Sequence, residues 1–261
     1  MASAPLERRL LAGHLGLVYL FLYGPIVVLV ALSFNKSGLP TAWTGFSLEW
    51  YGKMLGNASI RAAVANTLIV AVFSTLISTA IGTLLALGLE RGKRHALLDA
   101  FIFVPMIIPD IVLAVALLSF YTLLNFTLGL HSIIISHAVF NIAFVCVVVR
   151  TRLKHFDMSI IEASIDLGAS EIRTFFRITL PVIFPGVLAG ALLAFTLSVD
   201  EFIIANFTAG AGPSSTTFPM RIYAMIRFGV TPEINAVATI VLGVSFLLVF
   251  ISQRLNRDAL R

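Results

Sequence analysis

Residues 157–181 read DMSIIEASIDLGASEIRTFFRITLP, a mixed polar and apolar stretch in a chain that is otherwise strongly apolar. Of the 261 residues, 59% are hydrophobic and only 12% are charged, whereas soluble domains carry about 25% charged residues. So much apolar surface needs lipid around it, so the chain is predicted to lie in a membrane. The stretch is too long and too patterned for a simple connection between two spans. It predicts two short helices with a turn at Gly168.

Six apolar segments of the chain are long enough to cross a bilayer, because about 20 residues span the hydrocarbon core. We expect transmembrane helices at residues 10–34, 62–89, 97–124, 132–149, 182–207 and 234–252. The first segment is too long for the apolar part of a signal peptide, so it should remain as an anchor. The sequence therefore predicts an all-α membrane protein with a single transmembrane domain over residues 1–261.

The basic residues of the chain are distributed unevenly between the two sides of the predicted membrane. Most of the 18 Lys and Arg residues fall on the side that holds both termini and residues 157–181. Because cytoplasmic loops are rich in Lys and Arg, this side is predicted to be cytoplasmic. The same bias accounts for the net charge of +5, so nucleic acid is not an expected partner.

The sequence gives little support to an enzyme. It has no Gly-x-x-x-x-Gly-Lys-Ser/Thr loop for binding phosphate, so ATP hydrolysis in this chain is not expected. The five His residues are scattered, and the single cysteine, Cys146, lies in an apolar run. We therefore expect no catalytic residue, no metal site and no cofactor in this chain.

Three acidic residues within the predicted spans are candidates for a substrate pathway, since ionisable groups inside a membrane are costly. Asp110 follows the second of two prolines, Pro105 and Pro109, which should break the third span. Asp200 and Glu201 lie near the end of the fifth span. Two solvated acids at a helix end are the structural alternative for this pair, and both interpretations stay open.

Small residues recur at every fourth position in two of the predicted spans, the spacing that lets helices approach closely. In the second span they are Ser74, Ser78, Gly82 and Ala86, and in the fifth they are Gly186, Gly190, Ala194 and Ser198. We interpret both series as helix-packing surfaces, either inside one bundle or across a subunit interface.

The mixed stretch carries the most specific motif. Glu162-Ala163-Ser164, then Gly168, then after nine residues Ile178-Thr179-Leu180-Pro181, resembles the Glu-Ala-Ala loop of ABC-importer permeases. Ser164 stands where that loop has its second Ala. An amphipathic helix resting on the membrane is the alternative, but it predicts a basic polar face, whereas acids and bases are mixed here.

In that loop, small residues would seat the first helix in a groove, Gly168 would permit the turn, and Ser170 would cap the second helix. Phe175 and Phe176 would add exposed aromatic surface for a partner to bury. The residues expected to couple the chain to an ATPase are Glu162, Ala163, Ser164, Gly168, Ala169, Ser170, Phe175, Phe176, Ile178, Leu180 and Pro181.

The resemblance covers the whole chain. Residues 46–51, 109–112, 198–202 and 228–236 look like the permeases of spermidine/putrescine importers. Relatives with this pattern also carry opines, aminobutyrate, aminoalkylphosphonates, ferric iron or thiamine, so the cargo stays open. A cationic amine would suit Asp110, Asp200 and Glu201 in the pathway.

The resemblance implies a type I ABC importer of the bacterial inner membrane. Its partners would be a homologous permease, two ATPase subunits that bind ATP and Mg, and an extracytoplasmic substrate-binding protein. Residues 157–181 would be the coupling segment between the fourth and fifth spans. The competing class is a secondary transporter that works without ATP, which would need no such segment. A second alternative is a membrane protein that acts only as a scaffold. Such a protein would not need a span that is broken by proline and contains Asp110.

Overall fold

The structure is a computed structural model, and it describes residues 4–38, 42–91, 96–154, 157, 159–227, 229 and 232–259. Within these ranges the elements are helical, and the extended pairing consists of one isolated bridge between Asn35 and Phe46. The predicted all-α class is confirmed. The chain divides into two compact units, residues 1–60 with 222–261, and residues 61–221. The single domain over residues 1–261 stays a prediction.

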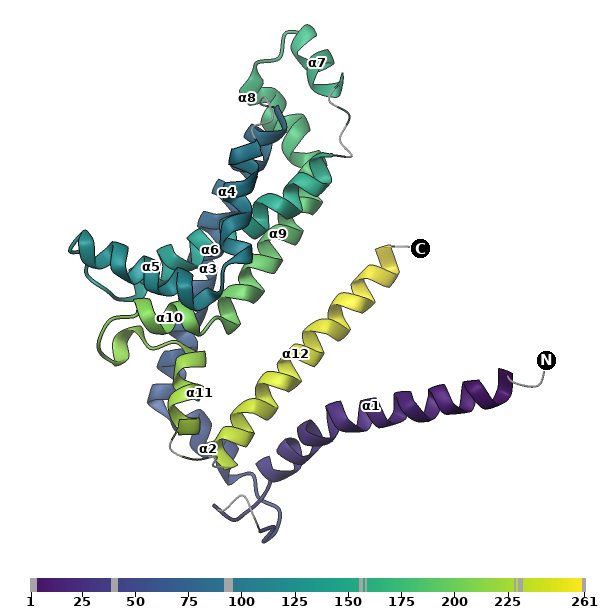
Figure 1. The fold of residues 1–261 in the computed structure, drawn as a ribbon, viewed down its shortest axis with the longest axis vertical. Coiled ribbons are helices and arrows are strands. Elements are labelled where there is room, and N and C mark those ends of the chain that lie inside the picture. Colours follow the sequence, from purple (N-terminus) through teal and green to yellow (C-terminus); the bar gives the residue numbers. More distant parts are fainter. Residues whose placement is uncertain are drawn as a thin grey trace. The chain divides into compact units, whose positions relative to one another are not determined.

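Figure 1 shows the order of the elements along the chain. The helices are α1 (Ala4–Ser33), α2 (Glu49–Gly56), α3 (Ala58–Arg91), α4 (Ala96–Ile107), α5 (Asp110–Leu123), α6 (Leu130–Leu153), α7 (Ser159–Asp166), α8 (Glu171–Thr174), α9 (Leu180–Asp200), α10 (Ile203–Thr208), α11 (Phe218–Arg227) and α12 (Pro232–Ala259). A π-helical turn, Phe175–Thr179, joins α8 to α9, and a 3-10 turn, Pro213–Ser215, precedes α11.

Four helices in the described part of the chain are long and apolar enough to cross a membrane, or up to five if α4 and α5 form one broken crossing. The four correspond to the predicted first, second, fourth and fifth spans. The predicted sixth span lies within α12, whose described apolar portion, Pro232–Val244, is shorter than a crossing. Six spans therefore stay a prediction.

The predicted third span is two helices, because the chain bends by 107° between α4 and α5. Pro109 has no N–H to continue the helical ladder, and it steers the preceding residue toward extended backbone. Helix α5 then restarts with bonds from the N–H groups of Val112 and Leu113 to the carbonyl of Pro109, at 2.9 and 3.3 Å. Pro109 breaks this span as predicted, whereas Pro105 lies inside α4 and does not break it. The bend is too large for one straight crossing over residues 97–124.

The helix of the predicted fifth span, α9, ends earlier than predicted. Helix α9 stops at Asp200, Glu201 has extended backbone with ψ 121°, and α10 is a separate short helix. The predicted span at 182–207 is therefore a helix only as far as Asp200. The physical reason is that Glu201 accepts the N–H groups of Ile204 and Ala205, which starts a new helix at that point.

Helix α6 is the centre of the unit formed by residues 61–221. Its residues Val145 and Val149 lie in one buried apolar cluster with Ala86 of α3 and Ile183 of α9. Both series of small residues are buried, and their glycines face α6. A Cβ atom on Gly82 would lie 2.8 Å from Cβ of Val145. A Cβ atom on Gly186 would likewise lie 2.8 Å from Cβ of Arg152. The structure thus places these surfaces inside one bundle.

One ion-pair network joins the ends of three helices in this unit. Arg150, near the end of α6, donates to Glu90 of α3 at 2.9 Å and to Asp99 of α4 at 2.6 Å. The Arg150 side chain is only 15% exposed, so water screens these bonds weakly. The network therefore fixes the ends of α3 and α4 against α6.

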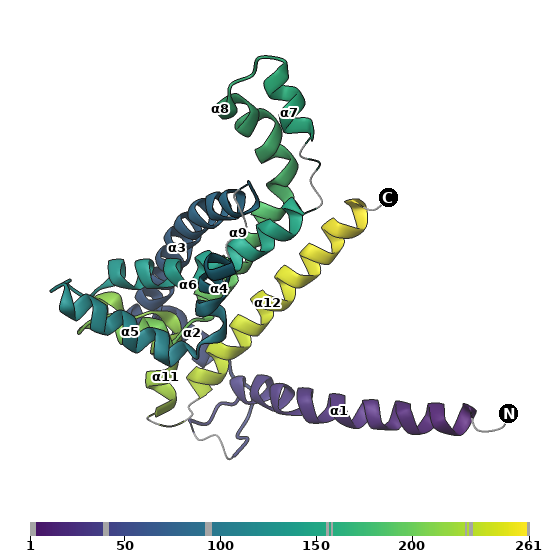
Figure 2. The ribbon, with the colours of Figure 1, turned by 45° about the horizontal axis from the view of Figure 1, so that its top comes forward.

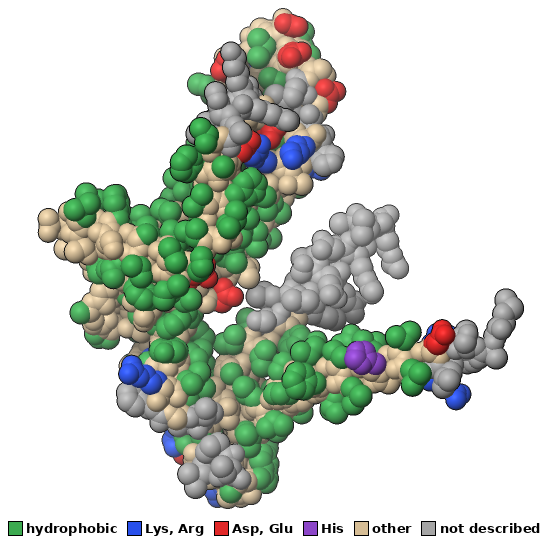
Figure 3. All heavy atoms as spheres, viewed as in Figure 1, with side chains coloured by type: hydrophobic (Ala, Val, Ile, Leu, Met, Phe, Trp, Pro, Cys, Tyr) green, Lys and Arg blue, Asp and Glu red, His purple; other side chains and the backbone are tan. Residues whose placement is uncertain are grey.

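The other unit contains α1, α2 and α12, and α12 contacts both of the other helices. Asn57 at the end of α2 donates to Glu233 in the first turn of α12 at 3.2 Å. Phe34 stacks on Phe46 and packs against Tyr51, which folds the segment after α1 back on itself. Figure 3 shows hydrophobic side chains on the outside of the helices, the pattern expected for surfaces that face lipid.

Candidate functional site

Residues 157–181 fold into α7, a turn, and α8, which runs through the π-helical turn into α9. Figures 1 and 2 both place α7 and α8 beyond the ends of α6 and α9. The second short helix is thus continuous with a long one, although the sequence predicts two separate short helices. Pro181 cannot donate to the carbonyl of Arg177, so the regular ladder is interrupted there, and Leu180 N–H instead reaches the carbonyl of Phe175.

The turn after α7 requires a glycine. Gly168 has φ +81°, in the left-handed region that side chains with a Cβ rarely adopt. Its N–H donates to the carbonyl of Ile165 at 2.8 Å, and the N–H of Ala169 donates to the carbonyl of Ser164 at 3.1 Å. Nothing lies within 4 Å of a Cβ at Gly168, so the requirement is conformational and not steric. The predicted turn at Gly168 is confirmed.

Side chains cap both helices of the segment. Ser170 Oγ accepts the N–H of Arg173 at 3.4 Å, as predicted for the start of α8. Asp157 Oδ1 accepts the N–H of Ser159 at 3.0 Å at the start of α7. Hydrogen bonds from Ser159 lower the pKa of Asp157, so its carboxylate stays ionised at the positive end of the helix.

The segment has a buried inner face. Ile161 and Ser164 of α7 are each 8% exposed, and Thr174 of α8 is 2% exposed. Ser164 Oγ and Thr174 Oγ1 lie 2.9 Å apart, so a hydrogen bond joins α7 to α8. Ser164, the one departure from the Glu-Ala-Ala pattern, therefore makes a bond that an alanine cannot make.

The outer face of the segment is apolar and exposed. Leu167 is 88% exposed, Ile172 is 73% exposed and Phe176 is 62% exposed. Phe175 differs, because it is partly buried against the cluster around Val149. The prediction of an exposed Phe175 is wrong, since this ring is half-buried against that cluster. The other predicted coupling residues are exposed (Glu162, Ala163 and Pro181) or half-buried (Ala169, Ile178 and Leu180).

The three candidate pathway acids lie at two helix breaks. Asp110 is exposed in the first turn of α5, and Asp200 is exposed as the last residue of α9. The Glu201 side chain is only 8% exposed. It does not fit the alternative of a solvated acid at a helix end. Asp200 and Glu201 are adjacent in the sequence, but in the structure the Asp200 side chain is exposed and the Glu201 side chain is buried.

The two helix breaks pack against each other. Leu113 and Ala114 of α5 share a buried cluster with Ile204 of α10. Ile108, just before the first break, and Ile203, just after the second, pack against the same cluster. Asp110 and Asp200 therefore lie next to two helices, α5 and α10, that pack against each other.

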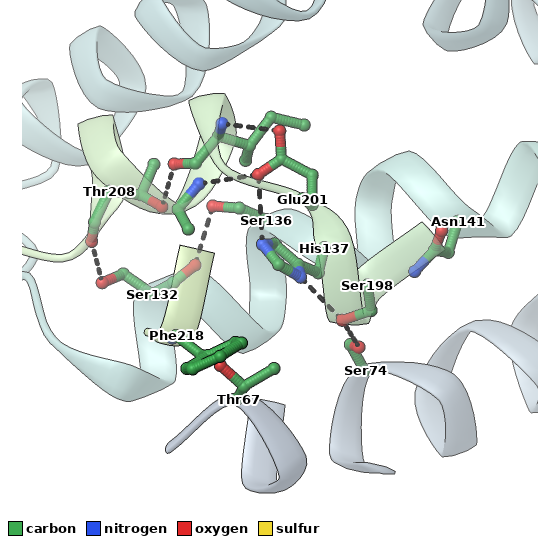
Figure 4. Close-up of polar contacts among 12 residues, drawn as sticks. Thr67, Ser74, Ser132, Ser136, His137, Asn141, Ser198, Glu201, Thr208 and Phe218 are labelled. Carbon is green, nitrogen blue, oxygen red and sulfur yellow. Dashed lines mark hydrogen bonds and ion pairs between the residues drawn. The ribbon is translucent and has the colours of Figure 1, made fainter. Parts of the chain in front are cut away.

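A buried histidine holds the second break. His137 of α6 is 1% exposed, and its Nδ1 lies 2.7 Å from Ser198 Oγ. Its Nε2 lies 3.5 Å from Glu201 Oε2, and Ser198 Oγ lies 3.1 Å from Ser74 Oγ. Figure 4 shows these side chains linking α3, α6 and α9 to the start of α10. In the sequence His137 is one of five scattered histidines to which no functional role is assigned. A polar ring inside an apolar span needs a hydrogen-bond partner, and this requirement is the signal in the sequence that points to His137.

The connection that follows α10 is also anchored by polar contacts. Ser132 Oγ donates to the carbonyl of Thr208 at 2.6 Å. The N–H of Phe218 donates to Thr67 Oγ1 at 2.7 Å, and Asn66 donates to the carbonyls of Ser214 and Thr216. These bonds keep the chain after α10 against α3 and α6, so the short helix is held at both ends (Figure 4).

Comparison with known proteins places the chain among transport proteins. Residues 78–261 match the family described as "Binding-protein-dependent transport system inner membrane component". The chain is 42% identical to the spermidine/putrescine transport system permease protein PotC of Escherichia coli (strain K12), over 96% of this chain and 95% of the relative. It is 38% identical to the putrescine transport system permease protein PotI of the same strain, over 93% of this chain and 90% of the relative.

Solved structures of ABC transporters share the fold. A bacterial ABC transporter involved in the import of alginate, an acidic polysaccharide, matches with a TM-score of 0.71 and 16% identity, over 97% of this chain and 98% of that chain. The MetNI methionine ABC transporter matches with a TM-score of 0.61 and 20% identity, over 82% and 99%. At these identities the likeness concerns the fold alone.

Proposed function

Since the chain belongs to the family of inner membrane components of binding-protein-dependent transport systems, we propose that it is a permease subunit of an ATP-driven importer of spermidine or putrescine. The observation that carries the proposal is the 42% identity, over nearly the whole chain, to a permease named for these amines. The relatives named PotC and PotI favour polyamines over the other cargoes that the sequence leaves open.

The rest of the transporter is supplied by other chains. A homologous permease pairs with this one, two ATPase subunits bind ATP and Mg on the cytoplasmic side, and a substrate-binding protein delivers the amine from outside. The lack of a phosphate-binding loop in the sequence supports a division of labour in which this chain performs no hydrolysis. The excess of Lys and Arg on one side supports cytoplasmic termini.

The coupling segment receives the motion of the ATPases. The exposed apolar side chains Leu167, Ile172 and Phe176 offer a surface that only a partner can bury. Charged residues of both signs surround this surface in the sequence: the acids are Glu162, Asp166 and Glu171, and the bases are Arg173 and Arg177. Such charges would orient a protein partner on the surface. Because α8 runs into α9 without a loop, displacement of α7 and α8 displaces α9 as a rigid element.

The far end of α9 carries the exposed acid that suits a cationic amine. We assign the attraction of the amine to Asp110 and Asp200, because both carboxylates are exposed beside helix breaks. Glu201 has a different role, since its carboxylate already accepts two backbone N–H groups and lies beside His137. Glu201 shapes the break, and Asp200 presents its charge from it.

The test is uptake of radiolabelled spermidine and putrescine into vesicles that contain the complete transporter. We expect uptake that requires ATP, the ATPase subunits and the binding protein. Uptake without the ATPase, or uptake driven by an ion gradient alone, would identify a secondary transporter instead. ATP-dependent uptake of another cargo, with no polyamine uptake, would leave the importer class intact and overturn the substrate.

A further inference from the structure

The inner face of the coupling segment holds a pair of hydroxyl groups that the function proposed above does not use. Ser164 Oγ of α7 and Thr174 Oγ1 of α8 are 2.9 Å apart, and both residues are at least nine-tenths buried. A buried hydroxyl is costly without a hydrogen-bond partner, so each group depends on the other.

This bond spans two elements, whereas the bond of Thr196 stays within one helix. Thr196 Oγ1 donates to the carbonyl of Leu192 at 2.8 Å, four residues earlier in the same helix. Such a bond satisfies the hydroxyl locally and fixes nothing else. The hydroxyl of Thr174 is directed to another helix, across the turn at Gly168.

Helix α7 has few other attachments of this kind. It has eight residues, a length at which an isolated helix is marginal in water. Its described buried side chains are Ile161 and Ser164, so α7 buries one apolar and one polar side chain. Thr174 lies directly before the π-helical turn that leads into α9. The hydroxyl pair therefore connects α7 to the base of the long helix.

We propose that Ser164 and Thr174 form a latch that fixes the angle between α7 and the base of α9, so that movement of the ATPase reaches the membrane helices without slippage. The proposal rests on the coupling role assigned to residues 157–181. Both are positioning residues, because they act through α7 and not on the amine. An alanine at position 164, as in the Glu-Ala-Ala pattern, would leave Thr174 without this partner.

The experiment compares Ser164→Ala, Thr174→Val and the double variant in the complete transporter. The readout is the number of ATP molecules hydrolysed per spermidine imported, measured with the yield of assembled complex. We expect each single variant to raise this ratio about two- to tenfold, in line with the loss of one hydrogen bond. The double variant should be no worse than either single one, because each change removes the same bond.

Matched controls separate the latch from general damage. Thr174→Ser keeps the hydroxyl and should retain a near-normal ratio, whereas a loss caused only by packing would persist. Thr196→Val makes the same chemical change on an exposed face of α9, where the ratio should not move. Additive effects of the two single variants, or a normal ratio in both, would overturn the latch.

A covalent version gives a second measurement if the single variants assemble poorly. Ser164→Cys with Thr174→Cys, in a Cys146→Ala background, places two thiols where the hydroxyls now meet. Oxidation by copper–phenanthroline forms a disulfide and should keep the ratio low, and reduction should raise it. An unchanged ratio on reduction overturns the latch. If the complete wild-type transporter imports no polyamine with ATP, the proposed function fails instead, so the two failures are distinguishable.

Discussion

At the scale of single residues, two neighbouring acids at the end of α9 differ in their surroundings. Asp200 is exposed, whereas the carboxylate of Glu201 is buried between two backbone N–H groups and His137. Asp200 is the last residue of α9, whereas Glu201 has extended backbone, so the two side chains leave the chain in different directions. Adjacent acids in the sequence therefore need not share a role.

Substitution of the two acids should have different effects on stability and on uptake. Glu201→Ala leaves the N–H groups of Ile204 and Ala205 unsatisfied, so the free energy of unfolding should fall by about 1–3 kcal/mol. Asp200→Asn should leave the thermal midpoint unchanged and raise KM for spermidine severalfold, because only an exposed charge is removed. Unfolding curves and uptake kinetics check both outcomes. Equal effects of the two substitutions on stability and KM would contradict the assignment.

Gly168 is the residue on which the shape of the coupling segment depends. Gly168→Val places a β-branched residue at φ +81°, which costs about 1–3 kcal/mol of backbone strain. We expect normal membrane insertion and loss of ATP-dependent uptake. Gly88→Val is the matched control, because Gly88 is exposed within α3 and nothing lies within 4 Å of the point that a Cβ atom would occupy there. Normal uptake in the Gly168 variant would remove these residues from the coupling role.

At the scale of helices, close approach to α6 explains the small residues of α3 and α9. Gly82→Ala would bring a methyl group within 2.8 Å of Cβ of Val145, so the two helices must move apart. Overpacking of this kind should lower the free energy of unfolding by about 1–3 kcal/mol. Gly88→Ala, on the exposed face of the same helix, should be neutral or slightly stabilising. Thermal unfolding in detergent compares the two, and equal midpoints would contradict this packing.

The ends of α3, α4 and α6 depend on one arginine. Arg150→Gln removes the charge that bonds Glu90 and Asp99, and both acids are only partly exposed. Stability should fall by about 1–3 kcal/mol, since two partly buried carboxylates then lose their cationic partner. Lys53→Gln is the control, because its pair with Glu49 is exposed and should matter by less than about 1 kcal/mol. A similar loss of stability in both variants would show that the Arg150 network contributes no more than an exposed ion pair.

At the scale of the whole molecule, α9 connects the two proposed functional regions. Its continuation through α8 reaches Glu171, so a single apolar helix of 30 residues runs from the coupling segment to Asp200. The two helix breaks that flank Asp110 and Asp200 pack together beside its far end. A displacement at α7 can therefore change the surroundings of both exposed acids through one rigid element, which is a shear or hinge type of transition.

The substrate proposal is checked at this scale as well. In vesicles with the complete transporter, excess unlabelled putrescine should reduce uptake of labelled spermidine. γ-Aminobutyrate should not reduce it, because this compound also carries a carboxylate that the exposed acids disfavour. The measurement is initial uptake with each competitor at a fixed ATP concentration. Inhibition by γ-aminobutyrate and not by putrescine would indicate that the transporter carries another substrate.

Features that depend on local chemistry could be predicted from the sequence alone. Hydrophobic length predicted the all-α membrane class, Pro109 predicted the break between α4 and α5, and Gly168 and Ser170 predicted the turn and the cap. Each follows from the backbone limits or hydrogen bonds of residues within a few positions of one another.

Which side chains meet across the bundle could not be predicted, because it depends on how the helices pack. The tertiary structure placed Phe175 against the core, directed the glycines of both small-residue series to α6, and paired Glu201 with His137. His137 and Ser198 are 61 positions apart, and Ser74 and Ser198 are 124 positions apart. Hydropathy and spacing describe which face of a helix is apolar, but they carry no information on which other helix covers that face. Which polar groups are buried and which of them pair depends on which helices pack together.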